Sequence, residues 1–99
     1  MKLDLNKIDS VKLDEYFNKH GINCYIPKNN KHISFMSLTR SDYSDYYLDL
    51  YEDGSYTTHV EDYISNDYRA DEQLLVGVYG FAQECFDLLK KYLADEGTE

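Results

Sequence analysis

Basic residues are scarce in this chain, and their scarcity argues against one group of partners. Of the 99 residues, 10 are Lys or Arg and 19 are Asp or Glu, so the net charge is -9 and the pI is near 4.6. DNA, RNA and anionic membranes attract basic surfaces, because their phosphates need a countercharge. The composition therefore predicts no direct binding to nucleic acid or membrane, and the expected partner is a basic protein.

Long apolar runs are missing as well. The N-terminus MKLDLNKID has no apolar signal core, and no stretch approaches the ~20 apolar residues of a membrane span. We therefore expect a cytoplasmic protein. In that compartment Cys24 and Cys85 are expected to be reduced thiols of the core, because both have apolar neighbours.

Sequence motifs for catalysis or metal binding are also lacking. The three histidines do not have the spacing of zinc ligands. A calcium loop that began at Asp49 would place Tyr51 and Val60 where oxygen ligands are needed. No serine has the context of a nucleophile elbow, and the glycines form no phosphate-binding loop. The sequence thus predicts a protein that is not an enzyme and holds neither a metal nor a cofactor.

The residues that are present are those of a folded protein. Apolar residues make up 42% of the chain and aromatic residues 15%, and this length suffices for one core. We expect a single α+β domain over residues 1–99, built in two layers. Its expected order is an N-terminal helix, an antiparallel sheet of about four strands and a long C-terminal helix, with both helices on one face of the sheet.

The N-terminal region predicts the first helix. Residues 3–8 form an apolar lead-in that is either an edge strand or a segment packed under this helix. From Ser10 apolar residues recur every three or four positions, with Asp9 or Ser10 as the N-cap and Gly21 as the C-cap.

Two strands are expected next. Residues 22–26 alternate in polarity and end at Pro27. Residues 32–39 predict a second strand with apolar side chains on both faces. The short turn between them implies antiparallel pairing.

The clearest hairpin signal lies at residues 45–52 and 55–61, around Asp53-Gly54. This dipeptide favours a type I′ turn, whose twist matches that of the flanking strands. In a two-residue register the expected cross-strand pairs are Tyr51 with Tyr56, Asp49 with Thr58, and Leu48 with His59.

The two faces of this hairpin differ in chemistry. Leu48 and Leu50 lie on one face, whereas Asp49 lies at the centre of the other, where burial of an unpaired carboxylate is costly. We therefore expect the leucines to face the core. The outward face is expected to carry Tyr47, Asp49, Tyr51, Tyr56 and Thr58.

Residues 70–94 carry the widest apolar stripe and predict the core helix. Gly77 and Gly80 are unfavourable inside a helix, so they indicate either close contact with another element or a helix start near residue 78. The expected core positions are Leu74, Val78, Phe81, Cys85, Leu88 and Tyr92, flanked by Leu75, Ala82, Phe86, Leu89 and Leu93.

Negative charge and tyrosine concentrate in residues 41–72. Ten acids and one base give this segment the whole net charge of -9, and it holds seven of the eleven tyrosines. Carboxylates two residues apart on a strand lie about 7 Å apart and can imitate a row of phosphates, while tyrosines add rigid contact area. The alternative interpretation is that these acids keep the protein soluble and contact no partner. The binding interpretation assigns partner contact to Asp42, Asp45, Tyr47, Asp49, Tyr51, Glu52, Asp53, Tyr56, Glu61 and Asp62.

The short length, the segment DYSDYYLDLYEDGSY and the order of helix, hairpin sheet and helix resemble small inhibitors that phages and mobile elements use against host defence. These include anti-CRISPR proteins and anti-restriction DNA mimics. The resemblance concerns architecture and charge and includes no diagnostic motif. It implies a non-catalytic inhibitor in the host cytoplasm that occupies a nucleic-acid-binding groove on a nuclease or DNA-binding protein.

Two other classes fit the same surface. An immunity protein or antitoxin would use it to cover a cognate nuclease toxin. An adaptor subunit of a larger assembly, or a homodimer, would use the open face of the sheet as its oligomer interface.

Overall fold

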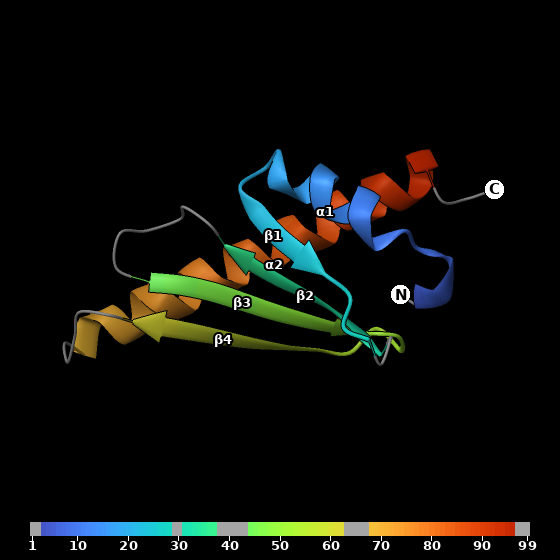
Figure 1. Ribbon diagram of the computed structural model, residues 1–99. Helices are drawn as coiled ribbons and strands as arrows, with labels where there is room; N and C mark the ends of the chain where they lie inside the picture. The colour runs from blue at the N-terminus through green and yellow to red at the C-terminus, as the bar shows by residue number, and fades with distance from the viewer. Residues whose placement is uncertain (1–2, 29–30, 38–43, 63–67, 97–99) are drawn as a thin grey trace.

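Two helices cover one face of a four-stranded sheet in this protein (Figure 1). A computed structural model describes residues 3–28, 31–37, 44–62 and 68–96. The predicted α+β order of an N-terminal helix, an antiparallel sheet and a long C-terminal helix is confirmed. The elements are the 3-10 helix η1 (Leu5–Lys7), α1 (Ser10–Asn18), β1 (Ile22–Tyr25), β2 (His32–Ser37), β3 (Ser44–Tyr51), β4 (Tyr56–Asp62) and α2 (Tyr68–Glu96).

The N-terminal lead-in is a packed segment and not an edge strand. Leu3 and Leu5 are buried in the core, and residues Leu5–Lys7 form the single turn η1. The Leu3 N–H donates to the backbone carbonyl of Glu52 at 3.0 Å. This bond ties the start of the described chain to the turn between β3 and β4.

Helix α1 begins at one of the two predicted N-caps, but its C-cap is Lys19 and not the predicted Gly21. Asp9 is the N-cap, and its Oδ1 accepts hydrogen bonds from the N–H groups two and three residues later at 3.0 and 3.3 Å. Gly21 follows the helix with φ 75°, a left-handed conformation that glycine adopts without strain. Leu13 and Phe17 are fully buried, and the Phe17 ring centroid lies 5.0 Å from that of Phe35 on β2.

The sheet is an antiparallel meander in the order β1-β2-β3-β4. Alternate residues of each strand face the helices, which is the period of two that a half-buried sheet requires. The expected inward direction of Leu48 and Leu50 is confirmed, since both are at most 2% exposed. The other buried inward positions of the first three strands are Ile22, Cys24, Ile33, Phe35 and Ser37.

The hairpin between β3 and β4 forms, but the predicted two-residue turn and register are wrong. Asp49 pairs with Thr57, and Leu48 pairs with Thr58. The Gly54 N–H donates to the Tyr51 carbonyl at 2.9 Å, and the Tyr51 N–H donates to the Ser55 carbonyl at 2.8 Å. The loop therefore holds three residues, 52–54, and its last residue, Gly54, has φ 93°.

This one-residue shift moves β4 side chains to the opposite face of the sheet. Tyr56 pairs with Leu50 instead of Tyr51, so it lies on the helix-facing side. Its ring centroid is 5.1 Å from that of Phe86 on α2, although 47% of the residue stays exposed. The expected outward positions of Tyr56 and Thr58 are thus both wrong, because a third loop residue was not foreseen.

Helix α2 supplies the largest part of the core and extends beyond the predicted ends. Its buried residues recur every three or four positions, which matches the predicted stripe except that Leu89 is buried while Leu88 is only half-buried. The side chains of Leu74 and Leu75 lie outside the described residues. The buried positions are Val78, Phe81, Ala82, Cys85, Leu89 and Tyr92.

The helix runs through both glycines without interruption, so the alternative of a start near residue 78 is wrong. At Gly77 a Cβ atom would overlap the hydroxyl group of Tyr46 and lie 2.8 Å from its ring carbon Cζ. Gly77 therefore marks close contact with β3. At Gly80 a Cβ would meet nothing within 4 Å, and nothing in the structure explains a glycine there.

Both cysteines are buried and neither forms a disulfide, as predicted. Burial raises the pKa of the Cys24 thiol far above its usual value. Within the described part of the chain, no helix combines the length and the apolar character needed to cross a membrane.

Candidate functional site: the outer face of the sheet

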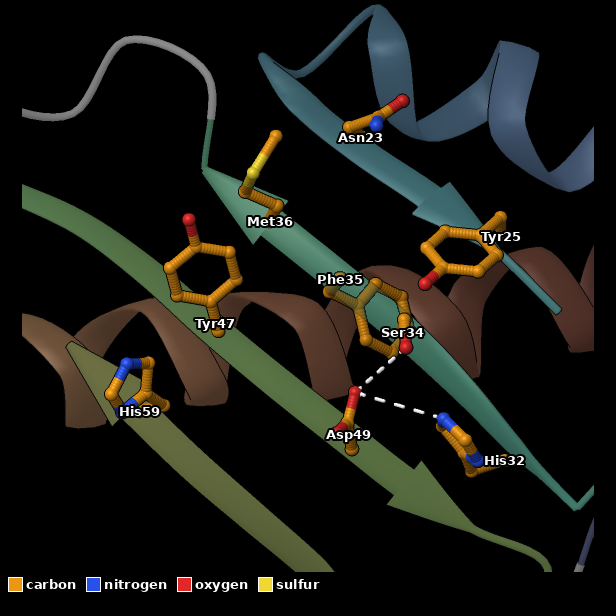
Figure 2. A pocket seen from close by; sticks show the side chains of 9 residues that line it. All are labelled: Asn23, Tyr25, His32, Ser34, Phe35, Met36, Tyr47, Asp49 and His59. Atoms are coloured by element: carbon orange, nitrogen blue, oxygen red, sulfur yellow. Dashed lines mark hydrogen bonds and ion pairs between the residues drawn. The ribbon is translucent and has the colours of Figure 1, made fainter. Parts of the chain in front are cut away.

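The face of the sheet that points away from α1 and α2 contains an open hollow of about 580 Å³ (Figure 2). All four strands contribute to it. The described lining residues are Asn23 and Tyr25 from β1, His32, Ser34, Phe35 and Met36 from β2, Tyr47 and Asp49 from β3, and His59 from β4. We call these residues the outer hollow.

The strand register brings the outer hollow together. Positions that alternate with the core residues stand side by side across neighbouring strands, because cross-strand partners share a face. Two adjacent rows result. One row consists of Tyr25, Ser34 and Asp49, and the next consists of Asn23, Met36, Tyr47 and His59.

Asp49 is the acid at the centre of this surface. Its Oδ1 accepts a hydrogen bond from the Ser34 hydroxyl at 2.7 Å, and the Nε2 of His32 lies 3.9 Å from the same oxygen. The Asp49 side chain is 41% exposed. The prediction that this carboxylate lies on the solvent side, opposite the leucines, is therefore confirmed.

Serine, histidine and aspartate here do not have the order of a hydrolytic triad. In a triad the serine donates to the histidine, and the carboxylate orients that histidine. Ser34 instead donates directly to Asp49. This arrangement fixes the carboxylate, and the histidine does not stand between serine and aspartate as a triad requires.

Aromatic contacts border the outer hollow on two sides. The rings of Tyr47 and His59 lie 5.6 Å apart, and those of His32 and Tyr51 lie 5.2 Å apart, both in tilted arrangements. Tyr25 on the edge strand is 57% exposed. The surface therefore offers rigid aromatic area around a single held carboxylate.

Two further predicted acids, Glu52 and Asp53, are exposed in the β3–β4 turn. Ser55 donates to Asp53 Oδ1 from its hydroxyl at 2.6 Å and from its N–H at 2.9 Å. These bonds hold the pKa of Asp53 below its usual range. The turn thus adds negative charge at the end of the sheet, next to the outer hollow but not within it.

Three further acids of the predicted set lie on β3 and β4. Asp45 lies on β3, half-buried, four residues before Asp49 and on the same face. The backbone of Glu61 pairs with that of Asp45, and the backbone of Asp62 pairs with that of Ser44. Asp42 lies outside the described residues. Of the predicted residues whose side chains the structure describes, Tyr47 and Asp49 line the outer hollow.

Six of the nine described lining residues lie outside residues 41–72, where charge and tyrosine concentrate, so the charge pattern did not indicate them. The signal that could have found them is the alternation in β1 and β2. Once Ile22 and Cys24 are assigned to the core, Asn23 and Tyr25 must face outward. The same reasoning applied to Ile33 and Phe35 places His32, Ser34 and Met36 on the outer face.

Among the described residues, no three His, Cys, Asp or Glu side chains gather as a metal site. No family model, curated protein or solved structure matches this chain.

Proposed function

We propose that this protein is a non-catalytic inhibitor that binds a basic groove on a nuclease or DNA-binding protein and so keeps nucleic acid out of that groove. The outer face of the sheet and the acidic β3–β4 turn form the contact surface. Such a protein would act in the manner of anti-CRISPR and anti-restriction inhibitors.

One observation carries the proposal: Tyr25 and Tyr47 line the outer hollow around Asp49, and Asp49 belongs to the segment 41–72 that carries the net charge. Complementary potentials speed the encounter with a basic groove, and aromatic residues at an interface core slow dissociation. The exposed acids Glu52 and Asp53 suit the first role, and Tyr47 and Tyr25 suit the second.

The test begins with a basic DNA-binding partner captured from a host lysate. Its binding to labelled DNA is then measured by fluorescence anisotropy while this protein is added. The proposal expects stoichiometric displacement of the DNA. A partner that binds this protein and DNA together would overturn it.

Variants then separate charge from contact. The double variant Glu52→Lys with Asp53→Lys is expected to lower the association rate at low salt and to lose this effect near 1 M salt, where the Debye length is about 3 Å. Tyr47→Ala is expected to raise the dissociation rate instead. The control Glu15→Lys with Asp87→Lys makes the same change of charge on exposed helical positions and is expected to change both rates less.

The same data distinguish the other classes. A captured partner that is a toxin encoded beside this gene would identify an immunity protein. A mass that doubles with concentration, without any captured partner, would identify the open sheet face as a self-association surface and would overturn the inhibitor proposal.

A further inference from the structure

We infer that the outer hollow is the receptor for one arginine side chain of the partner, with Asp49 as the anion that the guanidinium binds. This inference deepens the proposed function and rests on it for the identity of the partner as a basic protein. It assigns the centre of the contact to a single side chain on each molecule.

The charge of the outer hollow selects a cation. Its described lining contains one carboxylate, Asp49, and neither lysine nor arginine. The Nε2 of His32 lies 3.9 Å from Oδ1 of this carboxylate, which is beyond hydrogen-bond distance. A positive group that enters the hollow therefore meets an acid that no lysine or arginine of the lining neutralises.

Asp49 is held in position before any ligand arrives. Its Oδ1 accepts the hydrogen bond from Ser34 and faces His32. The second oxygen, Oδ2, makes no hydrogen bond or ion pair with the described residues, and the side chain is 41% exposed. A fixed carboxylate with one free oxygen binds a cation at a lower cost in side-chain entropy than a mobile surface acid.

The shape of the surroundings favours arginine over lysine. Tyr47 precedes Asp49 by two residues on the same face, and Tyr25 stands in the same cross-strand row as Asp49. In Figure 2 the hydroxyl of Tyr25 points toward the Ser34 and Asp49 pair. A planar guanidinium can stack on tyrosine rings and donate several hydrogen bonds in its plane, whereas an ammonium is a point charge with a strong hydration shell.

The test uses N-acetyl-arginine amide as the probe and the methyl group of Met36 as the reporter. The chain has two methionines, and Met36 lines the hollow, so a methyl-labelled sample gives a simple spectrum. We expect a saturable shift of the Met36 signal on titration. N-acetyl-lysine amide is expected to bind roughly three- to fivefold more weakly, which is the ratio that one cation–π contact supplies.

Two matched variants locate the site. Asp49→Asn removes the charge and keeps the shape, and it is expected to abolish the saturable shift. Glu15→Gln makes the same change of charge at an exposed position of α1, outside the hollow, and is expected to leave it intact. Ser34→Ala keeps the charge but releases Asp49, so weaker binding with a normal amide spectrum is expected.

Equal shifts with the arginine and lysine probes, or a shift that survives Asp49→Asn, would overturn the inference. If Asp49→Asn alters the amide spectrum as a whole, the Ser34→Ala titration decides, and unchanged arginine binding by that variant would overturn it as well. The proposed function is judged separately. If Asp49→Asn weakens DNA displacement no more than Glu15→Gln does, the inhibitor proposal stands without the arginine receptor. Arginine binding without any basic partner would leave the receptor standing without the inhibitor proposal.

Discussion

Gly77 and Gly80 lie in the same helix but have different surroundings. The Tyr46 hydroxyl occupies the space of a side chain at Gly77, and its ring lies 6.1 Å from that of Phe81. An added methyl group must move Tyr46 and disturb this contact. At Gly80, by contrast, the space is open and the position is exposed.

We therefore expect Gly80→Ala to stabilise the protein by about 0.5–1 kcal/mol, through the better helix propensity of alanine. Gly77→Ala gains the same propensity but loses about 1–3 kcal/mol to overpacking. In chemical denaturation, the free energy of unfolding of Gly77→Ala should be at least about 1 kcal/mol lower than that of Gly80→Ala. Equal stability of the two variants would contradict the contact with Tyr46.

Cys24 gives a prediction for alkaline pH. Burial, with smaller contributions from Asp14 and Cys85, raises the pKa of this thiol above its ordinary value of 9.0. The unfolded chain therefore releases the thiol proton before the folded chain does, so the folded state loses stability as pH rises above about 9. Cys24→Ala is expected to have a flatter decline of unfolding free energy between pH 8 and pH 10 in urea titrations. An identical slope in both proteins would contradict this account.

At the scale of elements, the β3–β4 turn decides which side chains reach the outer face. Its third loop residue, Gly54, has φ 93°, where a β-branched residue is strained. Gly54→Val is expected to lower the free energy of unfolding by about 1 kcal/mol or more. Gly54→Asn should cost less, because asparagine tolerates positive φ better. If both variants melted like the parent protein, the turn would not need this conformation.

The stability that helix α2 contributes depends on which residues of its apolar stripe are buried. Leu89 is 0% exposed, whereas its neighbour Leu88 is half-buried at the edge of the core. Leu89→Ala is expected to cost about 2–5 kcal/mol through the cavity it leaves. Leu88→Ala should cost less than half as much in the same denaturation experiment. The reverse order would show that the helix is rotated from the position described.

The sequence predicted the elements better than the contacts between them. Apolar periodicity identified the helices and strands, and the charge of Asp49 correctly oriented the leucine face of β3. The hairpin register depended on whether the loop held two or three residues, and an Asp-Gly pair is compatible with both. That single ambiguity misplaced Tyr56.

The candidate site was harder to predict because it spans elements far apart in the chain. Tyr25, Ser34 and Asp49 stand in one row only after three strands pair in register. The charge pattern pointed to residues 41–72 and could not indicate β1 or β2. Polar alternation in those strands carried the missing information.

For the molecule as a whole, the two faces of the sheet differ in what lies on them. The helices α1 and α2 cover one face of the sheet (Figure 1), and the other face carries the outer hollow (Figure 2). The acids Glu52 and Asp53 lie in the turn at one end of this face, and Asp49 lies within it. The proposed function assigns long-range attraction to the turn and short-range contact to the outer hollow, which are neighbouring parts of one surface.

The central claim is that the partner binds the outer face of the sheet, and methyl spectra of the complex test it most directly. Met36 reports on the outer hollow, while Val11 is 66% exposed on α1, on the helical side. With methionine and valine methyl groups labelled, addition of the captured basic partner is expected to shift or broaden the Met36 signal and to leave the Val11 signals in place. A change at Val11 without a change at Met36 would place the partner on the helices and contradict the account.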